Sequence, residues 1–128
     1  MDGTYLTTLE GHTDRVTSVA VSKDGSTVVS GSRDNSVMIW DADGGRALKG
    51  HTEHVTSVAI SPDSKYVFST SGDMTLKVWS LATGLCINTL TAHYKRVSSV
   101  AVWESDEIMY AVSGSWDHTI KVWAFSQQ

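Results

Sequence analysis

The chain repeats itself three times, and this repetition limits its fold more than any other feature. A repeat of about 40 residues is typical of proteins built from similar units placed side by side, because one such unit cannot bury its apolar surfaces alone. The three copies run from Gly11-His12 to Trp40-Asp41, from Gly50-His51 to Trp79-Ser80, and from Ala92-His93 to Trp123-Ala124.

Four residue types keep fixed spacings within each copy. In the first two copies a serine, an aspartate and a tryptophan follow the histidine by 18, 22 and 28 residues. In the third copy they follow by 20, 24 and 30 residues, because two extra residues lie in the stretch 103–107. The three sets are His12, Ser30, Asp34 and Trp40; His51, Ser69, Asp73 and Trp79; and His93, Ser113, Asp117 and Trp123.

Each copy has the pattern of short β-strands separated by turns, without a segment of helix length and helical period. The runs that start at Val16 and Val55 hold small, β-favouring residues, which suit a strand crowded near an axis. Asp24-Gly25 and residues 62–64 are turn sequences. A later strand in each copy alternates two apolar faces, so each unit is expected to pack between two neighbours in an all-β fold. These alternating pairs are Val37 and Ile39, Leu76 and Val78, and Ile120 and Val122.

The repeats resemble the WD-repeat family, whose signature pairs Gly-His with Trp-Asp about 30 residues later. Ala92 replaces one glycine, and Ser80 and Ala124 replace two of the final aspartates. The resemblance implies a β-propeller of four-stranded blades, with three blades in one unit over residues 1–128. The blades are expected at about 10–49, 50–91 and 92–128. It also implies that each Asp, His, Ser and Trp set forms a buried hydrogen-bond chain across the inner three strands.

The same resemblance predicts how the ring is completed. Residues 85–90 match the outer strand of a blade, and residues 4–9 match it in front of His12. Residues 125–128 directly follow a third strand, so the last blade is expected to need an outer strand from elsewhere. Three blades are too few for a closed ring of four to eight. We therefore expect a homodimer of six blades, each chain lending residues 4–9 to the other, or a homotrimer of nine. The alternative to self-assembly is that the chain is a piece of a longer propeller.

The spacing before the second copy predicts an irregular outer strand. Trp40 and His51 are 11 residues apart, whereas Trp79 and His93 are 14 apart. The outer strand within residues 41–49 is therefore expected to be short or distorted.

The recurring Ser, His and Asp also suggest a hydrolase triad. Three copies of a nucleophile site in one short chain would be unusual, and no Gly-x-Ser-x-Gly or oxyanion signal accompanies them. We therefore predict that the sets are structural and that the protein is not an enzyme. Replacing Asp34, Asp73 or Asp117 by alanine is expected to lower stability and to remove no catalytic activity.

The sequence predicts no metal and no cofactor. His51 and His54 are the one close histidine pair, Cys86 stands alone, and Gly44-Gly45 is too short to cradle a phosphate. Cys86 is expected to be a small packing residue on an outer strand. A single cysteine allows no disulfide within the chain, which favours the cytoplasm, with the nucleus as the alternative. The chain does not start like a signal sequence, and it has no apolar run long enough to span a membrane. The sequence therefore predicts neither export nor membrane insertion.

In the resembled family, three positions of each blade project onto the face that binds partners. They are the residue before the repeated aspartate and two residues near the start of the innermost strand. Arginine and tryptophan are favoured interface anchors, and a basic rim on a chain with 10 Lys and Arg against 14 Asp and Glu favours an acidic or phosphorylated peptide. Nucleic acid bound by the same arginines is the alternative. The predicted partner-binding residues are Arg15, Thr17, Arg33, His54, Thr56, Arg96, Ser98 and Trp116. Gly72 takes the position before the repeated aspartate in the second blade.

Overall fold

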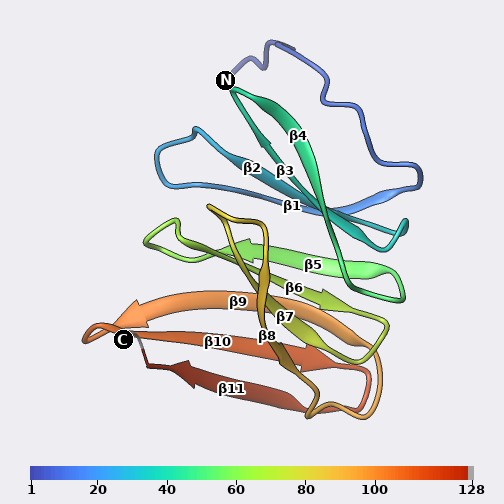
Figure 1. The fold of residues 1–128 in the computed structure, drawn as a ribbon, viewed down its shortest axis with the longest axis vertical. Coiled ribbons are helices and arrows are strands. Elements are labelled where there is room, and N and C mark those ends of the chain that lie inside the picture. The colour runs from blue at the N-terminus through green and yellow to red at the C-terminus, as the bar shows by residue number, and fades with distance from the viewer. Residues whose placement is uncertain (127–128) are drawn as a thin grey trace.

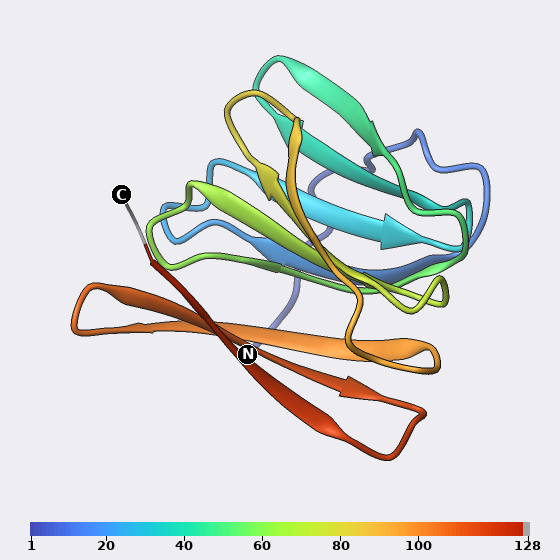
Figure 2. The same ribbon diagram turned by 60° about the horizontal axis from the view of Figure 1, so that its bottom comes forward.

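A computed structural model describes residues 1–126 and contains three antiparallel β-sheets, packed one against the next (Figures 1 and 2). In each sheet the strands follow chain order, so that every strand pairs with its sequence neighbour. The first sheet holds β1 (Val16–Val21), β2 (Val28–Ser32), β3 (Ser36–Asp41) and β4 (Gly44–Lys49); the second holds β5 (Val55–Ile60), β6 (Tyr66–Ser71), β7 (Leu76–Ser80) and β8 (Cys86–Leu90); the third holds β9 (Val97–Ser105), β10 (Ile108–Ser115) and β11 (Ile120–Phe125).

The innermost strands β1, β5 and β9 lie side by side and join the sheets. Between the first and second sheets, Val29, Ile39 and Trp79 are among the buried residues of one apolar cluster. Between the second and third sheets, Phe68 meets Phe125 edge-on, with ring centres 5.5 Å apart. The core therefore lies between the sheets, as predicted from strands with two apolar faces.

The two extra residues of the third copy lengthen one hairpin. β9 has 9 residues and β10 has 8, and they join through Asp106 and Glu107, both in the left-handed region of φ. On this hairpin Trp103 stacks on Tyr110 with ring centres 5.2 Å apart. The insertion thus extends an existing pair of strands and leaves the rest of the repeat in step.

Two expectations about outer strands were wrong. β4 is regular and pairs with β3 without a shift in register. Asp41 pairs with Gly44, so a two-residue turn absorbs the short spacing, helped by the positive φ of Gly44. The register shift falls instead in the second sheet, between Val78 and Trp79. Cys86 lies on β8 as expected, but its side chain is exposed and does not fill a packing space.

Residues 4–9 form no strand in this structure and are exposed. The third sheet has three strands within residues 1–126, and no described strand pairs with the outer edge of β11. Of the expected final segment 125–128, residues 127–128 lie outside the described residues. No helix long and apolar enough to cross a membrane occurs in the described part of the chain.

Candidate interaction face

The four repeated residues form a hydrogen-bond chain in every blade. In the second blade, His51 Nδ1 donates to Asp73 Oδ2 at 2.8 Å, His51 Nε2 bonds to the Ser69 hydroxyl at 2.7 Å, and Trp79 Nε1 donates to that hydroxyl at 2.8 Å. The chains built on His12 and His93 repeat this geometry, which confirms the predicted tetrad.

The tetrad serines are buried, which argues against a nucleophilic role. Ser69 and Ser113 are fully buried and Ser30 is 4% exposed. Each hydroxyl also accepts a hydrogen bond from a tryptophan indole, so it ties the third strand to the histidine. A buried hydroxyl that is hydrogen-bonded in this way stabilises the blade, because a buried polar group without a partner costs about 1 to 3 kcal/mol.

The tetrad aspartates stay ionised to unusually low pH. Burial desolvates Asp34 and by itself raises its pKa, but hydrogen bonds from Ser36, His12 and the Thr13 amide outweigh this effect and hold the pKa well below its usual range. For Asp73, bonds from His51 and Thr75 likewise outweigh desolvation and lower the pKa of the carboxyl. Asp117 follows the same pattern, with Thr119 and His93 as the main donors that lower its pKa.

Each tetrad also shapes the turn that carries the candidate partner residues. The residue after each aspartate has a positive φ, near 72° at Asn35 and His118 and 73° at Met74. The backbone N–H of the residue before each aspartate donates to a carbonyl in the loop that leads into the innermost strand. These bonds join Arg33 to Arg15, Gly72 to His54, and Trp116 to Arg96 at 2.9 to 3.0 Å. Two candidate positions therefore lie next to each other in every blade.

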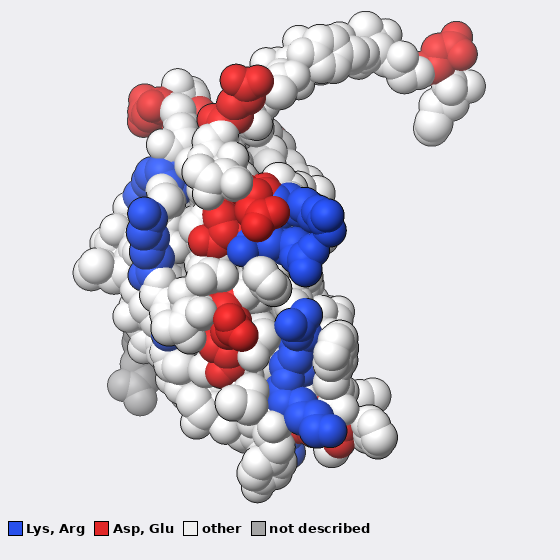
Figure 3. Space-filling model, turned by 90° about the vertical axis from the view of Figure 1, so that its right-hand side faces the viewer, with Lys and Arg blue, Asp and Glu red and all other residues white. Residues whose placement is uncertain are grey.

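The loops before β1, β5 and β9 and the turns after β2, β6 and β10 gather on one side of the molecule. This side, which we call the His–Asp face, lies at the right of Figure 1 and faces the viewer in Figure 3. Basic side chains stand in separate groups there, with acidic side chains beside them. The face is therefore mixed in charge and is not the uniformly basic rim that the predicted residues alone suggest.

In the third blade the predicted residues form a direct contact. The guanidinium carbon of Arg96 lies 4.7 Å from the centre of the Trp116 ring. Trp116 is 59% exposed, whereas Arg96 is half-buried. Lys95 precedes Arg96, and Tyr94, which is 84% exposed, precedes Lys95. One basic and aromatic group is thus assembled from a loop and a turn that lie 20 residues apart in the sequence.

Three predicted residues use their hydroxyls inside the structure. Thr17 Oγ1 donates to the Val55 carbonyl of the second blade at 2.6 Å, and Thr56 Oγ1 donates to the Val97 carbonyl of the third at 2.5 Å. Ser98 Oγ donates within its own blade, to Gly114. Thr17 and Thr56 therefore join neighbouring blades through a repeated contact.

The second blade separates the two basic groups of this face. His54 Nδ1 donates to the Arg33 carbonyl at 2.9 Å and so links the second blade to the first. Gly72 has no side chain, and a Cβ built there would lie 3.3 Å from Arg96 Nε and 3.4 Å from Glu53 Cβ. Arg15 and Arg33 therefore belong to one group and Arg96 to another, and the side chains of Arg96 and Glu53 lie close to Gly72.

Sequence reasoning missed the acidic residues of this face. Asp14 and Glu53 occupy the loop position that Lys95 takes in the third blade, directly before Arg15, His54 and Arg96. Their position next to predicted residues was a usable signal, since one loop carries both. The first loop is thus balanced in charge, the second is acidic, and the third is basic.

These features together define consecutive blades of a β-propeller: antiparallel sheets, two with four strands and the third with three within residues 1–126, joined at their innermost strands and each braced by an Asp, His, Ser and Trp tetrad. The chain belongs to the WD40 family, because the WD domain, G-beta repeat matches residues 3–41, 45–80 and 84–124. WD40 repeat proteins act as protein-interaction scaffolds, and such scaffold families are generally not enzymes.

Similar proteins and structures share this architecture. The chain is 39% identical over 122 residues to small ribosomal subunit protein RACK1 of Caenorhabditis elegans, covering 94% of this chain and 28% of that protein. It is 56% identical over 39 residues to the intraflagellar transport protein 122 homolog of Homo sapiens, covering 30% of this chain and 3% of that protein. The crystal structure of the RRP9 WD40 repeats matches with a TM-score of 0.81 at 29% identity, over 89% of this chain and 35% of the other. The structure of U3-55K gives the same values. This chain thus spans only a minor part of the length of these proteins.

Proposed function

We propose that this chain is a non-catalytic scaffold whose His–Asp face binds an acidic or phosphorylated protein segment. The observation that carries the proposal is the contact between Arg96 and Trp116. An arginine held over a tryptophan face keeps its N–H groups at the rim of the ring, where a carboxylate or phosphate can accept two of them.

The charge distribution indicates where the ligand's acidic groups bind. The third blade offers Arg96 with Lys95 beside it, and the first offers Arg15 and Arg33. Glu53 repels acidic groups from the second blade. We therefore infer that a peptide places its strongest negative charge at Arg96, beside Trp116, and passes Glu53 on the second blade with an uncharged residue.

Nucleic acid is the second candidate ligand. Tyr94 and Trp116 are exposed rings near basic side chains, and single-stranded nucleic acid binds by stacking bases on such rings. The chain's formal net charge of −4 disfavours this candidate. A steep fall in affinity as the salt concentration rises would indicate nucleic-acid binding, because each phosphate contact releases counterions.

The test compares three labelled probes by fluorescence polarisation: an acidic peptide with one phosphoserine, the same peptide with alanine at that position, and a single-stranded RNA of similar length. We expect the phosphopeptide to bind best. Arg96→Gln should weaken it about tenfold or more, since bonds to a charged partner contribute roughly 1.5 to 3 kcal/mol.

Lys23→Gln is the matched control, because it removes one exposed positive charge from the β1–β2 turn, at the opposite end of the sheet. Equal losses for Arg96→Gln and Lys23→Gln would contradict a specific site on the His–Asp face. Preferred binding of the RNA would replace the proposal with the second candidate.

We also infer that residues 1–128 act as one three-blade unit and that a homodimer, or alternatively a homotrimer, completes the ring. Exposed apolar residues on both end blades support this inference, among them Val19 on β1 and Val122 on β11. Light scattering after size exclusion should give two or three times the 13.9 kDa mass of one chain. A monomer would contradict self-assembly. The cytoplasmic location indicated by the single cysteine stays a prediction, which imaging of the tagged full-length protein would test.

A further inference from the structure

Gly72 stands at a position where the other two blades carry long side chains. Arg33 and Trp116 precede the tetrad aspartates of the first and third blades, as Gly72 does in the second. The backbone does not require a glycine there, because the φ of Gly72 lies outside the left-handed region. What the glycine provides is therefore found in the side chains around it.

Two side chains of opposite charge approach Gly72. A Cβ built on this residue would lie 3.3 Å from Arg96 Nε, 3.5 Å from Arg96 Nη2 and 3.4 Å from Glu53 Cβ. The shortest of these distances is tighter than most contacts of a real Cβ, so a side chain at position 72 would compete with Arg96 for the same space. The glycine thus allows the guanidinium of the third blade to lie against a turn of the second.

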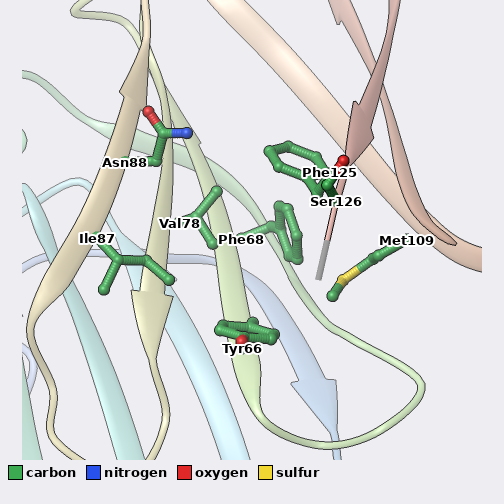
Figure 4. Close-up of a pocket in the computed structure, with 8 residues that line it drawn as sticks. All are labelled: Tyr66, Phe68, Val78, Ile87, Asn88, Met109, Phe125 and Ser126. Atoms are coloured by element: carbon green, nitrogen blue, oxygen red, sulfur yellow. The ribbon is translucent and has the colours of Figure 1, made fainter. Parts of the chain in front are cut away.

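The interface between the second and third blades fixes this approach. Thr56 Oγ1 donates to the carbonyl of Val97, the residue directly after Arg96. Farther along the interface, the ring of Phe68 faces that of Phe125 (Figure 4). A cavity of about 210 Å³ lies beside these rings, and the described residues that line it are uncharged. The cavity therefore lacks a positive group for an acidic ligand, whereas the His–Asp end of the same interface carries one.

Arg96 is restrained by two blades while its donors stay available. The Trp116 ring lies 4.7 Å from the guanidinium carbon, and the turn at Gly72 lies against Nε and Nη2. The equivalent residue of the second blade, His54, donates to the Arg33 carbonyl at 2.9 Å. Within residues 1–126, by contrast, the Arg96 guanidinium donates to no protein acceptor. A side chain restrained before binding loses less entropy when a ligand binds, so Arg96 is prepared to accept an acidic group.

Glu53 places a negative charge beside this donor. Its side chain is exposed, and its Cβ approaches the same point next to Gly72 that Arg96 approaches. In the described part of the chain, side-chain ion pairs join only the tetrad histidines and aspartates, so Glu53 does not neutralise Arg96 by direct contact. Neighbouring residues of an extended peptide are about 3.5 Å apart. A ligand whose acidic group binds Arg96 therefore brings an adjacent residue near Glu53.

We propose that Glu53, Gly72 and Arg96 form a selectivity site between the second and third blades, which accepts a segment with one isolated acidic group and rejects a run of acidic residues. The proposal rests on binding of an acidic or phosphorylated segment to the His–Asp face. Arg96 donates to the isolated group, and the Glu53 carboxylate repels a second negative group on an adjacent residue. Gly72 is a positioning residue, because it leaves Arg96 the space that it occupies.

The first test changes position 72 and measures binding of a labelled peptide with one phosphoserine. Gly72→Ala adds the Cβ that Arg96 must avoid. The control Gly114→Ala adds the same group where the nearest atom, Ser98 Oγ, is 4.0 Å away. We expect Gly72→Ala to weaken binding fivefold or more and Gly114→Ala to leave it within twofold. Neither should lower the urea midpoint, because alanine at a compatible φ reduces the entropy of the unfolded chain. Equal binding by the two variants would show that Gly72 does not position Arg96.

A second measurement follows the guanidinium without any ligand. The heteronuclear NOE of the Arg96 Nε–H group reports its mobility on the picosecond to nanosecond timescale. We expect a lower NOE, and hence a more mobile group, in Gly72→Ala than in the unmodified chain. Gly114→Ala should leave the NOE unchanged. A NOE that is the same in all three chains would overturn the positioning role of Gly72.

A third measurement changes the ligand and Glu53 together. Two further peptides carry a second phosphoserine, directly before or directly after the first. We expect at least one of them to bind the unmodified chain threefold or more weakly than the singly phosphorylated peptide. Glu53→Gln should remove this difference. Glu104→Gln, which removes the same charge from an exposed position near the other end of β9, should keep it. If neither peptide binds threefold more weakly, the selectivity is wrong.

Failure of this site can be told apart from failure of the proposed function. If the singly phosphorylated peptide binds and Arg96→Gln weakens it, while Gly72→Ala and Glu53→Gln behave like their controls, the acidic ligand stands and the selectivity site is wrong. If no phosphopeptide binds the unmodified chain, the proposed ligand of the His–Asp face is wrong and the selectivity site is wrong with it.

Discussion

Arg96 and Trp116 are joined twice: the guanidinium carbon lies 4.7 Å from the ring centre, and the Trp116 amide donates to the Arg96 carbonyl at 3.0 Å. The backbone bond fixes the distance between the two residues, and the ring then holds the long side chain. We predict that Trp116→Leu weakens binding of the acidic phosphopeptide about two- to fivefold, since an exposed cation–π contact contributes about 0.5 to 1 kcal/mol. Trp116→Phe should lose less. Fluorescence polarisation measures both, and equal binding by Trp116→Leu and the unmodified chain would contradict this role.

Asp73→Ala should lower the free energy of unfolding by about 1 to 3 kcal/mol, because His51 loses its acceptor inside the blade. Urea denaturation followed by tryptophan fluorescence checks this, with Trp79 reporting on the tetrad. Glu104→Ala, at an exposed position of β9, is the control and should change stability by no more than about 0.5 kcal/mol. A stability equal to that of the control would show that the tetrad does not brace the blade.

Stability should fall in strong acid because several carboxyl groups have lower pKa values in the folded chain than in the unfolded one. Hydrogen bonds from the Ser26 backbone, the Ser26 hydroxyl and Ser22 lower the pKa of Asp24 to about 2 from 3.8. A lowered folded pKa adds stability that is complete above the unfolded pKa and is lost as pH falls through the folded pKa. For Asp24 this window lies between about pH 4 and 2, and for the tetrad aspartates it extends lower. Urea midpoints should be level from pH 7 to 5 and decline below pH 4. A flat profile down to pH 2.5 would contradict these shifts.

Thr56→Val should lower stability by about 1 to 3 kcal/mol while leaving phosphopeptide binding unchanged. The valine keeps the shape of threonine but leaves the Val97 carbonyl of the next blade without its 2.5 Å hydrogen bond. Thr56→Ser restores a hydroxyl and should recover most of the loss. If Thr56→Val instead weakened the peptide without affecting urea denaturation, Thr56 would be a direct ligand contact and not a link between blades.

Met74→Asn should raise stability by roughly 0.5 to 1 kcal/mol. Met74 has a φ of 73° and is 45% exposed, so its side chain gains little from burial while its backbone is strained. Asparagine tolerates this conformation, and Asn35 is the residue at the equivalent position of the first blade. The reverse change, Asn35→Met, should lower stability. Thermal unfolding of both variants measures the effect, and shifts in the same direction would contradict the backbone explanation.

The sequence by itself determined the structure within each blade. Constant spacings between His, Ser, Asp and Trp specified the tetrads, and alternating apolar residues specified strands buried on both sides, because both patterns act over distances that one repeat spans. Even the two extra residues of the third copy were placed in the correct hairpin. The wrong prediction about the outer strand of the first blade had a local cause. The short spacing before His51 was attributed to the strand, although the turn before Gly44 absorbs it.

The tertiary structure alone decided what happens between blades. That Thr17 reaches the Val55 carbonyl, that His54 reaches the Arg33 carbonyl, and that Cys86 faces outward all depend on how one sheet packs on the next. The repeat pattern predicted that Arg15, Arg33, Arg96 and Trp116 share a face that binds a partner, and their contact with a partner stays a prediction. It did not show that Glu53 and Gly72 divide them, because charge on a surface depends on every loop that reaches it. A repeat fixes the bonds inside one unit, whereas a surface shared by several units is set by the packing that brings them together.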